Sequence, residues 1–384
     1  MFSSSISLRE GTVLLKKPIV AVSIVTFISL LLIFPFQLSS ASTASDLTPT
    51  FTIAIKDLGT LPSGSSASAN CINDLGQVVG WATVSNNVRH AFIGTTETGI
   101  EDLGTLPGGT TTIANGINNA GQVVGISAIN GVNHAFLWTP ENGIRDLGCL
   151  AGDTISNANA INNQGQIIGN SGIPGSSRVC LWTAPNNIIN IGGLPGATLN
   201  LATGINDNGQ VVGYSTINGV NQAFSWTPTG GVRGLELPGT ASVANGVSDK
   251  GEVVGSSTIN GVNHAYLWTA ENGMTDLGGL PGATGNIAIG INDNGQVVGR
   301  SDFGGGNPSH AFIWSAETGM TDLAATLGPI VCSARSINNE GQVAGWENLP
   351  YTNPAISHAI VWGKTLYVGV KDLGTLPGGT FSVA

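Results

Sequence analysis

A repeat of about 44 residues runs through almost the whole chain and constrains its fold more than any other feature. The clearest copy contains Ala114 to Gly125, His134 to Trp138 and Gly143 to Gly148. Aligned on the Gly-Gln step, which is Gly-Glu in the fifth copy, seven copies follow one another at spacings of 42 to 46 residues, at Gln77, Gln122, Gln166, Gln210, Glu252, Gln296 and Gln342. An array of this kind builds its core by stacking one small unit on its neighbours.

Each copy contains four short β-like segments. The first two, such as 113–118 and 122–127, flank a turn at Asn119 to Gly121, where Asn and Gly supply the backbone angles of a tight hairpin. The third, His134 to Trp138, alternates between two faces with the period of a strand, and a fourth follows. Four antiparallel strands in every copy predict an all-β, seven-bladed propeller. A β-solenoid is the main alternative, but its coils have shorter periods and lack repeated hairpins.

Two segments compete for the last strand of the seventh unit. Phe51 to Gly59 precedes the first full unit, and Thr365 to Gly374 follows the last. In a closed ring we expect the N-terminal segment to pair with the last blade, because this removes exposed sheet edges. The terminal residues 372–384 match the lead-in that starts at Asp102, so an eight-bladed propeller with a truncated last unit remains an alternative.

Residues 1–44 have the pattern of an export signal, ahead of a propeller domain at 45–384. Lys16 and Lys17 precede an apolar run from Pro18 to Leu38, and the small residues after it offer cleavage sites. The run is as long as a membrane span, so an uncleaved N-terminal anchor is the alternative, and the only membrane contact we expect. Either outcome predicts repeats in the extracellular space, at the cell surface or in the periplasm.

Composition excludes nucleic acid as an expected partner. Charged residues make up only 9% of the chain, its formal net charge is -10, and no basic patch could neutralise phosphates. The four cysteines stand at four different positions of the repeat and specify no disulfide framework or metal site; they are Cys71, Cys149, Cys180 and Cys332. A disulfide between Cys149 and Cys180 remains open.

The glycine-rich and Asn-rich loops predict turns rather than cofactor sites. No helix follows Leu106 to Gly109 to cradle a phosphate. The Asn-Asp-Asn-Gly loops at 206–209 and 292–295 lack the alternating carboxylates of a calcium site. We therefore expect no cofactor.

The triplet His-Ala-Phe, at His90, His134 and His310, stands in repeats with Ile-Asn-x-x-Gly-Gln-Val-Val-Gly and Asp-Leu-Gly-x-Leu-Pro-Gly. With these motifs, residues 51–384 resemble the bacterial extracellular HAF repeat family. The resemblance implies export and a propeller-like β array, and it carries no catalytic residues. The triplet is replaced at Arg178 to Cys180, among other places.

All five histidines begin a third segment, and each has an Asp in the fourth segment of its unit. The two segments form a hairpin, which brings these side chains within hydrogen-bonding distance. We predict five structural pairs: His90 with Asp102, His134 with Asp146, His264 with Asp276, His310 with Asp322, and His358 with Asp372. No metal site is expected, because equivalent points on adjacent blades are too far apart to share one ion.

No catalytic constellation stands out from the repeated pattern, so function is expected where the copies differ. The loops 302–309 and 347–357 are long, and the residue after the Val-Val-Gly step varies, with Trp81 and Trp346 expected to meet in a closed ring. Aromatic and polar side chains of this kind suit a sugar face or a protein surface, although the tryptophans also fit as filling between blades. The candidate ligand-binding residues are Trp81, Tyr214, Arg300, Asp302, Phe303, Trp346, Glu347 and Tyr351.

The sequence thus predicts an exported, non-enzymatic binding or interaction module for a cell-envelope glycan or protein. The alternative is an extracellular carbohydrate-active hydrolase or lyase.

Overall fold

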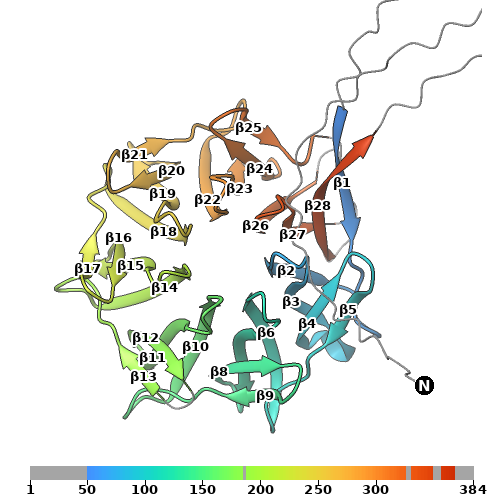
Figure 1. Ribbon diagram of the computed structural model, residues 1–384, viewed down its shortest axis with the longest axis vertical. Coiled ribbons are helices and arrows are strands. Elements are labelled where there is room, and N and C mark those ends of the chain that lie inside the picture. The colour runs from blue at the N-terminus through green and yellow to red at the C-terminus, as the bar shows by residue number, and fades with distance from the viewer. Residues whose placement is uncertain (1–49, 185–186, 326–329, 349–355, 368–384) are drawn as a thin grey trace, which may run out of the picture. The chain divides into compact units, whose positions relative to one another are not determined.

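The computed structural model describes residues 50–184, 187–325, 330–348 and 356–367. They belong to the second of two units into which the chain divides, residues 49–384. Their strands form a β-propeller, in which sheets surround a central channel (Figure 1). None of the described residues forms a helix that is long and apolar enough to cross a membrane.

The strands group into seven four-stranded antiparallel units among the described residues. Five are separate sheets, and two are joined into one eight-stranded sheet by a single parallel bridge between Ser177 and Leu199. We number these blades 1 to 7 along the chain. In blades 1 to 6 the strands lie in sequence order from the channel outwards, with the first strand innermost; in blade 7 the N-terminal strand of the chain takes the outermost place (Figure 1).

The innermost strands are β2 (Ala67–Ile72), β6 (Gly109–Ile117), β10 (Ile155–Ile161), β14 (Leu199–Ile205), β18 (Ala241–Val247), β22 (Gly285–Ile291) and β26 (Cys332–Ile337). The second strands are β3 (Val78–Thr83), β7 (Val123–Ile129), β11 (Ile167–Ile173), β15 (Val211–Ile217), β19 (Val253–Ile259), β23 (Val297–Asp302) and β27 (Val343–Asn348).

The third strands are β4 (Arg89–Thr95), β8 (Val132–Thr139), β12 (Ser176–Ala184), β16 (Val220–Thr227), β20 (Val262–Thr269), β24 (His310–Ser315) and β28 (Ser357–Tyr367). The outermost strands are β5 (Gly99–Asp102), β9 (Gly143–Asp146), β13 (Asn187–Asn190), β17 (Gly231–Gly234), β21 (Gly273–Asp276), β25 (Gly319–Asp322) and, in blade 7, β1 (Thr50–Asp57). A short 3-10 turn, Ser85–Asn87, lies between β3 and β4.

The ring is closed by the N-terminal strand. β1 pairs antiparallel with β28 over its whole length, from Thr50 opposite Tyr367 to Asp57 opposite Ile360. The first strand of the chain is therefore the last strand of blade 7, in the place where the sequence predicted it. Residues 368–384, the segment on which the eight-bladed alternative rests, lie outside the described residues.

The core consists of seven hydrophobic clusters, each formed between two neighbouring blades. Phe136 of β8 packs with Val79 and Ala91 of blade 1, whereas the adjacent Ala135 packs with Ala158 of blade 3. The third strand of the blade thus contributes side chains to the contacts on both faces of its sheet, as its alternating pattern predicted. Burial between blades is the main stabilising contribution to the array.

The glycine of the Val-Val-Gly step is required by close backbone packing. A Cβ atom on Gly125 would lie 2.0 Å from the carbonyl oxygen of Ile113 on β6. The pairing register of β6 shifts between Ala114 and Gly116, which makes Asn115 a bulge residue. The other six innermost strands shift at the equivalent residue.

The four cysteines are free thiols, so the open disulfide between Cys149 and Cys180 is absent. Cys180 and Cys332 are completely buried. Burial raises the pKa of Cys180 to about 12 and that of Cys332 to about 11, which keeps both thiols protonated. They act as small apolar core residues.

Candidate functional site

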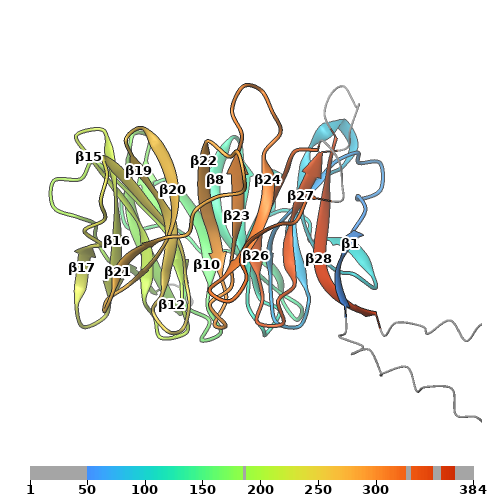
Figure 2. The same cartoon turned by 90° about the horizontal axis from the view of Figure 1, so that it is seen from above.

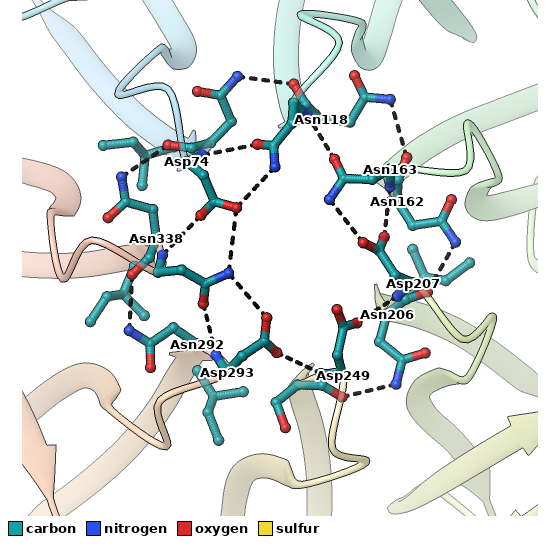
Figure 3. A pocket seen from close by; sticks show the side chains of 18 of the residues that line it. Asp74, Asn118, Asn162, Asn163, Asn206, Asp207, Asp249, Asn292, Asp293 and Asn338 are labelled. Carbon is teal, nitrogen blue, oxygen red and sulfur yellow. Dashed lines mark hydrogen bonds between the residues drawn. The ribbon is translucent and has the colours of Figure 1, made fainter. Parts of the chain in front are cut away.

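The channel has two different ends. The turns between strands 1 and 2 and between strands 3 and 4 lie at one end, which we call the turn face. The loops between strands 2 and 3 and the links to the next blade lie at the other, the loop face; in Figure 2 the loop between β23 and β24 projects beyond the strands there. At the turn face, residues from all seven blades line a polar pocket of about 200 Å³ (Figure 3).

An inner layer of asparagines holds the first turn of each blade. The Oδ1 atom of Asn73 accepts hydrogen bonds from the backbone N–H groups of Leu75 and Gln77, at 3.1 and 2.9 Å. Its Nδ2 atom donates to the side chain of Gln77 at 2.8 Å and to the backbone carbonyl of Asn118 in the next blade at 2.9 Å. Only an amide side chain supplies two donors and two acceptor positions here, which explains the Asn and Gln of the repeat.

This inner layer links six of the seven blade junctions among the described residues. Equivalent bonds leave Asn118, Asn162, Asn206, Asn292 and Asn338. Blade 5 differs, because Ser248 replaces Asn and Glu252 replaces Gln. The Ser248 hydroxyl donates to Glu252 at 3.0 Å and makes no bond to blade 6.

A second layer forms a complete circle at the mouth of the channel. The backbone N–H of each member donates to the side-chain Oδ1 of the next member, at 2.7 to 3.0 Å, and the last bond returns from Asn339 to Asp74. We call this set the Asx ring, and its members are Asp74, Asn119, Asn163, Asp207, Asp249, Asp293 and Asn339 (Figure 3).

Charge is distributed unevenly around the Asx ring. Amides of Asn119, Asn163 and Asn339 donate to neighbouring carboxylates at 2.9 to 3.0 Å. Asp207, Asp249 and Asp293, however, are three consecutive carboxylates with no amide between them. The Oδ2 atom of Asp249 has no hydrogen-bond partner among the described residues.

The pKa of Asp249 reflects this position. Desolvation at the pocket raises the pKa of this carboxyl most, and a hydrogen bond from the backbone N–H of Asp207 opposes the change. The negative charges of Asp293, Asp207 and Asp74 raise the pKa further. The three carboxylates therefore form an acidic arc at the pocket. The Oδ2 atoms of Asp207 and Asp293 each accept one bond from an Asn amide, and that of Asp249 is left without a donor among the described residues.

Sequence reasoning missed the Asx ring. The loops at 206–209 and 292–295 do form turns, as predicted, but they also place Asp207 and Asp293 in the ring. The available signal was the residue after the Ile-Asn step, which is Val-Ser in the fifth copy. That residue is Asp or Asn in all seven copies, although the residue that follows it differs from copy to copy. Turn geometry alone does not demand an Asx side chain at that position.

Trp81 and Trp346 do not form one aromatic platform. Trp346 lies on the same sheet face as Ala344, which packs with blade 1, whereas Trp81 lies on the same face as Val79, which packs with blade 2. The sheet of blade 1 therefore separates them. The Trp81 ring is also covered by the Arg89 guanidinium, whose carbon atom lies 4.1 Å from the ring centroid.

The other predicted ligand-binding residues are dispersed. Phe303 is half-buried, packs against the core cluster between blades 5 and 6, and makes an edge contact with His310, with ring centroids 5.1 Å apart. Arg300 forms an ion pair with Asp302, with Nε and Oδ1 3.4 Å apart. Tyr214 and Glu347 are half-buried in blades 4 and 7. Tyr351 lies outside the described residues.

The histidines are hydrogen-bonded to aspartates at the perimeter. Four pairs join the Nδ1 and Oδ2 atoms at 2.7 to 2.9 Å: His90 with Asp102, His134 with Asp146, His264 with Asp276, and His310 with Asp322.

The fifth pair differs from the prediction. His358 bonds Asp57 of β1 at 2.5 Å, because β1 occupies the fourth-strand position of blade 7. Asp372, the predicted partner, lies outside the described residues. Blade 3, which lacks this His, has an ion pair between Arg178 and the buried carboxylate of Asp153.

Comparison with known proteins supports the fold alone. No family model and no curated protein matches the chain. Among solved structures, a catalytically inactive virginiamycin B lyase from Staphylococcus aureus with quinupristin is similar at 14% identity and a TM-score of 0.54, over 82% of this chain and 99% of that one. An oligogalacturonate lyase in complex with manganese is similar at 10% identity and a TM-score of 0.52, over 83% of this chain and 96% of that one. A streptogramin B lyase gives 14% identity and a TM-score of 0.53, over 82% and 98%.

Proposed function

We propose that the protein is an exported binding module of the HAF repeat type that recognises a hydroxyl-rich ligand, a cell-envelope glycan, at the turn-face pocket. The acidic arc of Asp207, Asp249 and Asp293 carries this proposal. The Oδ2 atom of Asp249 is an acceptor that has no donor among the described residues, and sugar hydroxyl groups are donors of matching size. Export rests on the pattern of residues 1–44.

The rigidity of the pocket supports recognition. Each Oδ1 atom of the acidic arc is held by a backbone N–H of the preceding blade, so the Oδ2 atoms are fixed before a ligand arrives. Pre-organised polar groups bind with a smaller loss of conformational entropy. The loop-face residues predicted from the sequence expose less side-chain surface to a ligand, because Arg89 covers the Trp81 ring and Phe303 is half-buried against the core cluster.

A binding screen against a glycan array and an envelope extract tests the proposal. Replacing Asp249 with Asn removes charge from the arc without removing volume, and we expect affinity to fall about tenfold, the effect of one charge-assisted hydrogen bond. Trp81→Ala at the loop face is the control and should bind normally. If Trp81→Ala loses binding while Asp249→Asn keeps it, the site is at the loop face and the proposal is wrong.

The same arc favours a second candidate, glycoside hydrolysis. That chemistry uses one carboxyl group with a raised pKa as acid and a second, ionised one as base or nucleophile. Asp249 between Asp207 and Asp293 meets the first requirement. Release of reducing ends from bound glycans, lost in Asp249→Asn, would favour hydrolysis, whereas binding without turnover favours the module.

A further inference from the structure

The channel wall carries a third belt of side chains, deeper in the channel than the inner layer of asparagines and the Asx ring. The bulge residue of an innermost strand donates to a backbone carbonyl of the next blade: Asn70 to Ala114, Asn115 to Ala158, Asn159 to Ala202, Thr203 to Ala244, and Asn245 to Ala288. In blades 6 and 7 the belt is interrupted, because Ile289 and Arg335 occupy these positions.

Arg335 is exposed within the channel and has no ion-pair partner among the described residues. Arg300 of β23 lies on the same sheet face as Val298, and Val298 packs with Cys332 and Ala334 of β26. The face that bears Arg300 is therefore turned towards the strand that bears Arg335. Two guanidinium groups thus approach each other here, whereas the bulge residue carries an uncharged amide or hydroxyl in five blades and is Ile289 in blade 6.

Neither guanidinium group has a full set of hydrogen-bond and ion-pair partners among the described residues. The Nε atom of Arg300 is buried and makes no hydrogen bond, and Asp302 contacts it only as an ion pair at 3.4 Å. Desolvation lowers the pKa of Arg335 most, and the positive charge of Arg300 lowers it further. An arginine stays charged in a protein, so the repulsion persists until an anion arrives.

We propose that Arg335 and Arg300 form an anion site in the channel wall between blades 6 and 7, which takes the carboxylate or phosphoryl group of a ligand. Guanidinium groups bind both groups through paired N–H donors. The acidic arc repels anions at the turn face, so the anion enters from the loop face. This site is separate from the turn-face pocket and does not depend on the function proposed for that pocket.

Inorganic phosphate and acetate are the probes, used with the whole protein at constant ionic strength, with chloride as reference. We expect phosphate, acetate or both to raise the melting temperature and to bind in calorimetry, and their ranking distinguishes a phosphoryl from a carboxylate ligand. The matched variant is Arg335→Asn, which gives blade 7 the bulge residue that four other blades have. It should fold normally and bind the anion at least about tenfold more weakly.

Two further variants serve as controls, one at a distant arginine and one that conserves the charge of Arg335. Arg145→Gln, on the outer strand β9, should leave anion binding unchanged, and Arg335→Lys should retain part of it. The site is refuted if neither anion binds the natural protein, or if Arg335→Asn binds as tightly as the natural protein does. Asp249→Asn should bind phosphate at least as well as the natural protein, so failure of the glycan proposal would not be mistaken for failure of this one.

Discussion

The side-chain amide of Asn338 donates a hydrogen bond to the backbone carbonyl of Asn73, at 2.9 Å, although 265 residues separate the two. The same bond joins neighbouring blades at five other junctions, so blade 7 meets blade 1 through the contact that is general in the ring. The Asx ring closes in the same way, from Asn339 to Asp74. Closure is thus built into the repeat and is reinforced by β1.

Replacing Asn338 with Asp should destabilise the protein by at least ~2 kcal/mol. The change removes both donors of a buried amide and places a carboxylate against two acceptors, the Asn73 carbonyl and the Gln342 side chain. Chemical unfolding followed by circular dichroism measures the loss. Asn130→Asp, in an exposed turn, is the control and should change stability by less than ~0.5 kcal/mol. Equal curves for the two variants would show that the closing bond contributes nothing.

Asp57→Ala should lower the melting temperature, whereas Asp372→Ala should not. The reason is that His358 bonds Asp57, which joins the first strand to the last. In a double-mutant cycle, His358→Ala and Asp57→Ala should be coupled by ~0.5–1 kcal/mol, as expected for a partly exposed pair. Additive effects of the two changes, or a loss of stability in Asp372→Ala, would contradict this pairing.

The sequence was sufficient for the fold because the pattern is sampled seven times. One hairpin turn or one alternating strand is ambiguous, but seven copies with similar spacing define four strands in each unit and the order in which they follow one another along the chain. The partner of His358 was not decidable in this way, because Asp57 and Asp372 stand in the same local motif. The choice between them depends on which segment occupies the edge of blade 7.

The candidate site was harder to predict, for a physical reason. Asp74 and Asp207 look like ordinary turn residues when each loop is considered alone. Their function in the ring depends on contacts between blades, which lie about 44 residues apart and involve backbone groups that any sequence has. Trp81 and Trp346 show the reverse error, because the sheet of blade 1 lies between these two side chains although their blades are neighbours.

Asp249→Asn should raise the stability of the protein at pH 7. The folded state raises the pKa of Asp249 above its ordinary value of 3.8, so folding favours the protonated form and the ionised form is a penalty. That penalty is present above the folded-state pKa and disappears as the pH falls towards 3.8. We expect a gain below ~1 kcal/mol, since the side chain is exposed and screened by solvent.

Melting temperatures from pH 3 to pH 8 measure this effect. The difference between Asp249→Asn and the natural protein should be largest at neutral pH and should vanish in acid, because a protonated Asp249 donates a hydrogen bond as an amide does. If the difference in melting temperature between the two proteins is the same at every pH, titration of Asp249 is not its cause and the prediction is wrong.

At the junction between blades 5 and 6 a substitution should increase the stability of the protein, whereas Asn338→Asp decreases it. Ser248 is too short to reach the backbone of blade 6, and its hydroxyl is paired with Glu252, so the inner layer has its one described gap here. The pair Ser248→Asn and Glu252→Gln reproduces the other blades and supplies an amide donor for the carbonyl of Asn292. We expect a gain of ~0.5–1.5 kcal/mol in the free energy of unfolding, the net value of one hydrogen bond.

Denaturant unfolding of the double variant and of Glu252→Gln alone measures this gain. The single variant leaves Ser248 unable to reach blade 6, so its free energy of unfolding should increase less. If the double variant is no more stable than Glu252→Gln, the inter-blade bonds of the inner layer do not stabilise the ring, and closure would rest on the hydrophobic clusters and β1.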